Sequence, residues 1–170
     1  NTDTTGVGPS TGNTVISMTS AGEINYPLQP AFNAYLGSAD SNVTGDGTSF
    51  TIGSGNAMTE VFDQNGDFNT NGTFTTPVTG RYFLTAAILA QQATSAMTAA
   101  MSITTSNRTY SYGNWATAVN GNMPLSCTVL ADMDAADTAT VTVNFGGGAK
   151  VVDIYGAGDP RTYFHGKLSA

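Results

Sequence analysis

From residue 30 onward, apolar and polar residues alternate with a period of two in one segment after another. The clearest case is residues 138–145, in which the apolar side chains are Ala139, Val141, Val143 and Phe145. This alternation is typical of β-strands that bury one face. Glycine, asparagine, aspartate and proline separate the segments, as expected of turns. About ten strands are therefore predicted, which indicates an all-β sandwich or jelly roll. Besides 138–145, we expect strands at residues 31–36, 48–52, 58–62, 81–91, 97–103, 108–112, 125–132, 151–155 and 162–168, and around Phe74.

The longest apolar run, residues 81–91, is interpreted as a central strand. Its continuity predicts that it is buried on both faces. The alanine-rich residues 84–100, which overlap it, also have the composition of a helix. Because this stretch opens just after a turn and its neighbours are predicted strands, we expect a strand, a loop and a second strand.

Residues 1–29 differ from the body, residues 30–170, and are interpreted as a linker followed by a short β-arm. Within residues 13–29, apolar residues alternate on both sides of Gly22, which predicts two short strands joined by a glycine turn. Two isolated strands are only marginally stable in water. The arm is therefore expected to pair with the body or with the arms of neighbouring subunits.

Charge and cysteine content exclude several classes of protein. Charged residues make up only 10% of the chain, the formal net charge is −7, and no cluster of lysine and arginine occurs. Nucleic acid is therefore not an expected partner. No run approaches the roughly 18 apolar residues of a membrane-spanning helix, so membrane insertion is not expected. Cys127 is the only cysteine, which rules out an intrachain disulfide.

The segment 61–84, VFDQNGDFNTNGTFTTPVTGRYFL, combines aromatics and turn residues in an unusual order. Taken together with the first and the last predicted strand of the body, this segment resembles the C1q/TNF-like jelly roll, and the resemblance covers residues 29–170. The matching positions are Phe32, Asp63, Phe68, Phe74, Gly80, Tyr82, Phe164, Gly166 and Leu168. Ala57, Leu84 and Ala86 depart from the aromatics that the family prefers, and Phe68 and Phe74 lie one residue closer together than usual. Phrases such as NVTGDGT and EVFDQNGDF are similar to C1q-like modules of phage and bacterial surface proteins, and the arm resembles the shaft-to-head linkers of phage tail fibres.

This resemblance implies a homotrimer of jelly rolls around a threefold axis. Tyrosines suit such an axis because each presents an apolar ring with a polar tip. The candidates are Tyr35, Tyr82, Tyr155 and Tyr163. His165, the only histidine, follows the inward-facing Phe164 and is expected on the opposite face of the last strand, with a structural role.

Two groups of residues are candidate ligand sites. Tyr110, Tyr112 and Trp115 form an aromatic patch in a glycine- and asparagine-containing segment, RTYSYGNWAT, which could stack on sugar rings. The alternative is that the tyrosines face one side of a strand and Trp115 covers an end of the sandwich. A cluster of carboxylates could bind Ca²⁺, although aspartates also cap turns; its members are Asp132, Asp134 and Asp137. No catalytic motif is recognisable, and no other cofactor is expected.

The sequence thus favours a non-enzymatic trimeric head of a virion or cell-surface fibre. Such a module would attach to a host-surface glycan or protein by multivalent contact. The alternative is a capsid-decoration or filament subunit whose residues 13–29 pair with neighbouring subunits. Either hypothesis places the protein on a virion surface or outside the cell.

Overall fold

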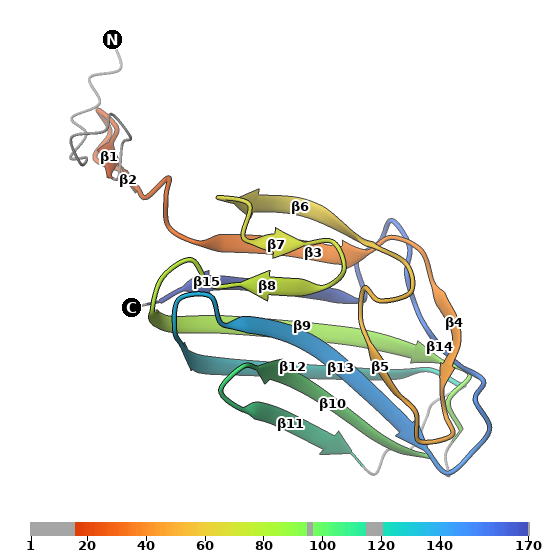
Figure 1. Ribbon diagram of the computed structural model, residues 1–170. Helices are drawn as coiled ribbons and strands as arrows, with labels where there is room; N and C mark the ends of the chain where they lie inside the picture. The colour runs from red at the N-terminus through yellow and green to blue at the C-terminus, as the bar shows by residue number, and fades with distance from the viewer. Residues whose placement is uncertain (1–15, 95–96, 115–120, 170) are drawn as a thin grey trace.

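The computed structural model describes residues 16–94, 97–114 and 121–169. Two antiparallel sheets pack face to face around one core, so the predicted all-β sandwich is confirmed (Figure 1). No helix in the described ranges is long and apolar enough to cross a membrane.

One sheet has seven strands arranged around the long strand β9. Strand β12 pairs with β9 along its whole length, and β15 and β14 share the other side of β9. Beyond β15 follow β3 and the edge strand β6, while β4 pairs with β14. The bounds are β3 (Ala31–Leu36), β4 (Asp40–Thr44), β6 (Met58–Gln64), β9 (Gly80–Gln91), β12 (Met123–Met133), β14 (Val152–Ile154) and β15 (Tyr163–Leu168).

The second sheet has six strands and is built around β13. Strand β10 lies along one side of β13, with β11 beyond it, and β5 and β8 pair with the other side. The bounds are β5 (Ser49–Thr51), β7 (Phe68–Asn69), β8 (Thr73–Thr75), β10 (Thr98–Thr105), β11 (Thr109–Asn114) and β13 (Thr138–Gly146). The alanine-rich stretch is strand, connection and strand, as predicted. Strand β7 was not predicted, and residues 42–47, which overlap β4, were interpreted only as a turn and a short edge, because turn-forming residues dominate both segments.

Aromatic side chains of the family motif form the centre of the core. Phe32 is 1% exposed, and its ring stacks on those of Phe68 and Phe74 at centroid distances of 4.8 and 4.6 Å. The ring of Phe164 meets Phe32 edge-on at 4.9 Å. These contacts join β3 and β15 of one sheet to β7 and β8 of the other, so the stacked aromatics hold the two layers together.

The prediction that residues 81–91 are buried on both faces is wrong. Side chains of β9 alternate: those that include Leu84 and Ile88 are buried in the core, whereas Phe83 on the other face is 40% exposed. The run is apolar because its second face carries Phe83, Ala87 and Leu89, which the described residues leave partly exposed. A second apolar surface on β9 is therefore open to a partner.

The N-terminal hairpin predicted around Gly22 is present as β1 (Ser17–Met18) and β2 (Ile24–Asn25). It leaves four apolar side chains largely exposed, namely Met18, Ile24, Tyr26 and Leu28. The segment that follows is tied to the body: the side-chain amides of Gln64 and Asn65 donate to the backbone oxygens of Tyr26 and Leu28 at 2.7 and 3.0 Å. The hairpin projects from the end of the sandwich at which the C-terminus also lies (Figure 1).

Gly72 provides a test of the turn that precedes β8. Its φ is +88°, and a Cβ there would lie 2.0 Å from the backbone oxygen of Ile52. Gly72→Ala is expected to lower the free energy of unfolding by about 2–4 kcal/mol, since a left-handed conformation and a backbone clash both oppose the methyl group. The matched control is Gly66→Ala, because Gly66 has a φ of +74° but open space around it. Equal losses in urea denaturation would contradict the clash.

Candidate functional site: the outer face of the seven-stranded sheet

The side chains of the seven-stranded sheet that point away from the core form a second surface, which we call the outer face. Strand register aligns them in rows across β12, β9, β15, β3 and β6. The central row consists of Thr128, Thr85, His165, Asn33 and Phe62. Most of this row is polar but uncharged.

A bulge in β6 adds apolar surface to the edge of the outer face. Phe62 pairs in register with Asn33, but Glu60 pairs with Ala34, so Val61 is an extra residue on β6. Bulges re-aim side chains, and here Val61 and Phe62 are both outward, with exposed fractions of 57% and 50%. Two successive apolar residues on one face are not expected from simple alternation.

Phe62 also lines a hollow of about 400 Å³ with Phe83 of β9, which we call the proximal hollow because it lies toward the arm. Its remaining walls are Ala31, Phe32, Asn33, His165, Gly166 and Lys167. Leu130 of β12 pairs in register with Phe83 and is 56% exposed. As site residues, Phe62, Phe83 and Leu130 were not predicted, although the unbroken apolar run of β9 was a signal of a second apolar face.

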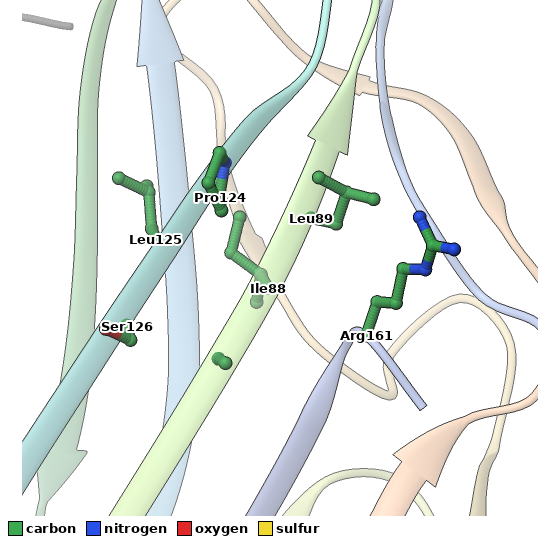
Figure 2. A pocket seen from close by; sticks show the side chains of 7 residues that line it. Ile88, Leu89, Pro124, Leu125, Ser126 and Arg161 are labelled. Carbon is green, nitrogen blue, oxygen red and sulfur yellow. The ribbon is translucent and has the colours of Figure 1, made fainter. Parts of the chain in front are cut away.

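A second hollow, the distal hollow, lies between β9, β12 and the start of β15 and has a volume of about 450 Å³. Leu89 and Pro124 supply apolar walls, and Arg161 stands beside them (Figure 2). The Arg161 Nε atom lies 2.8 Å from a carboxylate oxygen of Asp159, and its guanidinium lies 5.3 Å from the ring centroid of Tyr155. The hydroxyl of Tyr155 donates to Asp159 and lowers the pKa of that carboxyl.

His165 occupies the centre of the outer face. It lies on the side of β15 opposite the buried Phe164, as predicted. Its ring is parallel to that of Tyr163, with the centroids 5.5 Å apart. Partial burial, with no compensating charge, lowers its pKa below the usual value.

The four tyrosines proposed for a threefold axis occupy different environments. Tyr82 was assigned wrongly, because it is completely buried and its hydroxyl donates to the backbone oxygen of Val78 at 2.7 Å. It therefore belongs to the core of the protomer. Tyr35 and Tyr163 are half-buried and adjacent in register on the outer face, while the ring of Tyr155 lies next to the guanidinium of Arg161.

The aromatic ligand candidates are only partly within the described residues. Tyr110 and Tyr112 pair in register with Ile103 and Met101, both of which are buried, so the two tyrosines face one side of β11. Tyr110 packs against the core, whereas Tyr112 at the edge of the sheet is 48% exposed. Trp115 lies outside the described residues.

The structure does not bring the three calcium candidates together. Asp132 pairs with Arg108 at 3.0 Å, and Asp137 accepts a hydrogen bond from the backbone amide of Asp134 at 2.8 Å. Within the described ranges, no group of three acidic, histidine or cysteine side chains is arranged to hold a metal ion. Asp137 thus caps the β12–β13 turn, which is the alternative that turn chemistry suggests, whereas Asp132 is joined to Arg108 in the β10–β11 turn.

Loops at the end opposite the arm form the distal end of the molecule (Figure 1). There the backbone amide of Gly148, in the β13–β14 turn, donates a hydrogen bond to the backbone oxygen of Gly45, in the β4–β5 turn. The amide of Ala93, in the β9–β10 connection, donates to the oxygen of Gly121. Gly121 therefore belongs to this end, and so does Asn114, which pairs with Ala99 at the start of β10.

Comparison with solved structures shows the fold. The globular domain of zebrafish complement 1qA protein matches with a TM-score of 0.57 and 15% identity, covering 84% of this chain and 98% of that chain. Murine APRIL at pH 5.0 matches with a TM-score of 0.56 and 12% identity, covering 83% and 99%. No protein-family model matches the sequence, and no curated protein sequence does. The predicted C1q/TNF-like jelly roll is thus confirmed as the fold.

Proposed function

We propose that this chain is a non-enzymatic module that forms a homotrimer and attaches to a glycan or protein on a host surface. The observation that carries this proposal is the apolar outer face, where Phe62, Phe83 and Leu130 are 40–56% exposed in a single protomer. Soluble proteins seldom leave large apolar side chains grouped in this way unless a partner covers them. A second and a third copy of the chain would cover these residues and fill the proximal hollow.

The positions of the two ends support attachment through the distal loops. The arm leaves from the proximal end, so a shaft or virion that carried the arm would present the distal end outward (Figure 1). Three identical distal ends on one trimer would raise a weak single-site affinity by about 10² to 10⁴ through effective concentration. This arrangement suits a fibre head on a virion or cell surface.

The N-terminal hairpin favours a second candidate function, a capsid-decoration or filament subunit. Its strands are two residues long, and its exposed apolar side chains have no partner among the described residues. Pairing of residues 13–29 with a neighbouring subunit would bury them. The same trimeric body would then serve assembly, and the contacts with other virion or filament subunits would lie at the proximal end.

The first test is the molar mass in solution, measured by light scattering with and without residues 1–29. We expect a trimer in both cases. Trimers would then be applied to glycan arrays and to cells, with Tyr112→Ala and Trp115→Ala as variants, and binding that weakens in either variant would support attachment through the aromatic segment that contains these two residues. A monomer in both forms would contradict the trimer. Trimers that bind no surface, but polymerise only with the arm, would favour the assembly subunit.

A further inference from the structure

His165 separates two hollows of the outer face. On one side it lines the proximal hollow with Phe62 and Phe83. On the other side it lines a smaller hollow of about 230 Å³, with Val61 and Pro160 among the walls. Any second copy that covers the exposed apolar residues in both hollows also encloses the imidazole between them. The half-buried His165 of the protomer would then become a buried histidine in the trimer.

The groups that face His165 offer no acidic partner. From the neighbouring elements these are Thr85 on β9, Asn33 on β3, Val61 and Phe62 on β6, and Pro160 before β15. On its own strand, Tyr163 stacks on the ring and Lys167 lies two residues away on the same face. The nearest charged side chain on β15 is therefore a cation, which disfavours a second positive charge.

The carboxylates on the surrounding elements are engaged elsewhere or lie outside the central row. Asp63 accepts from the amides of Asp67 and Phe68, and Asp159 pairs with Arg161. Asp132 pairs with Arg108 and lies beside Arg81 in register. Glu60 is exposed at the edge strand, opposite the buried Ala34. Strand β3 carries no charged residue.

We propose that His165 makes the homotrimer acid-sensitive, so that protonation of three buried imidazoles drives the trimer apart into folded protomers. This inference rests on the trimer of the proposed function and adds its regulation. Burial without an acidic partner disfavours the charged imidazole, and the lowered pKa in the protomer has the same direction.

The sign of the pH dependence follows from proton linkage. Because burial lowers the pKa of His165 in the trimer below its value in the free protomer, dissociation takes up protons. The trimer is at full stability above the pKa of the free protomer, and stability is lost as the pH falls toward the pKa of the assembled state. Each histidine contributes a factor of 10 per pH unit within this window, so three reduce the association constant by up to about 10³ per unit.

The experiment is sedimentation velocity of the full chain over a range of protein concentrations at pH 7.5 and pH 5.0. We expect the wild type to be a trimer at pH 7.5 and to dissociate at pH 5.0, with unchanged far-ultraviolet circular dichroism. His165→Gln, which is polar but does not titrate, is expected to remain a trimer at both values. His165→Lys carries a permanent charge and is expected to be a folded monomer already at pH 7.5.

The outcomes separate this inference from the proposed function. A wild type that is monomeric at pH 7.5 overturns the trimer, and the inference with it. A wild-type trimer with the same concentration dependence at both pH values overturns the inference alone. Dissociation of His165→Gln at pH 5.0 to the same extent as the wild type also overturns it, because the carboxylates common to both proteins would then be responsible.

Discussion

Phe32→Ala is expected to lower the free energy of unfolding by about 3–5 kcal/mol. The side chain is 1% exposed, and its ring contacts the rings of Phe68, Phe74 and Phe164. Truncation removes buried apolar surface, leaves a cavity between the sheets and breaks three aromatic contacts. Since a typical domain has only about 5–15 kcal/mol of stability, this loss would remove a large part of it. Urea denaturation at one fixed protein concentration measures the loss.

The control for Phe32→Ala is Val78→Ala in the turn before β9. Val78 is 46% exposed, so its truncation is expected to change the free energy of unfolding by less than about 0.5 kcal/mol. If Phe32→Ala lost no more stability than this control, the stacked aromatics would not hold the two sheets together.

Phe83→Asp is expected to convert the trimer into a folded monomer. Phe83 is 40% exposed in the protomer, so a carboxylate there stays hydrated and hardly affects folding. In the trimer the same carboxylate would be buried in an apolar contact, at a cost of at least about 2 kcal/mol for each of three copies. The association constant should fall by at least about 10⁴. Light scattering gives the molar mass, and thermal unfolding shows whether the protomer is intact.

Val78→Asp is the matched control for this variant, because it places the same charge on a similarly exposed residue that lines none of the three hollows of the outer face. We expect it to remain a trimer. A trimeric Phe83→Asp variant would place the subunit contact on another surface. It would also remove the basis for the acid sensitivity assigned to His165.

Local pattern predicted the strands well where one face of a strand is buried. The alternation in residues 138–145 corresponds to β13, and the inward Phe164 correctly placed His165 on the other side of β15. The motif aromatics were recognised as core residues, and their stacking confirms that role. These features depend on residues two positions apart or on a motif within one segment, so a single sequence contains them.

Register between distant strands was not predictable in this way. The bulge that turns both Val61 and Phe62 outward exists only in the pairing of β6 with β3. The grouping of Phe62 with Phe83 joins segments some 20 residues apart across two intervening strands, β3 and β15. Likewise, Asp132 and Asp137 are only five residues apart in the sequence, but Asp132 lies on β12 of one sheet and Asp137 directly precedes β13 of the other.

By itself, the sequence determined that this chain is an all-β jelly roll with an aromatic core, a hairpin arm and little charge. Period-two alternation, turn residues and composition are local properties, and they are sufficient for those conclusions. Only the tertiary structure decided which apolar residues remain exposed on the surface of the protomer. It placed Tyr82 inside the core and Phe83, one residue later, on the outer face. Whether an apolar side chain is buried depends on what lies opposite it, and that is a property of the packed sheets.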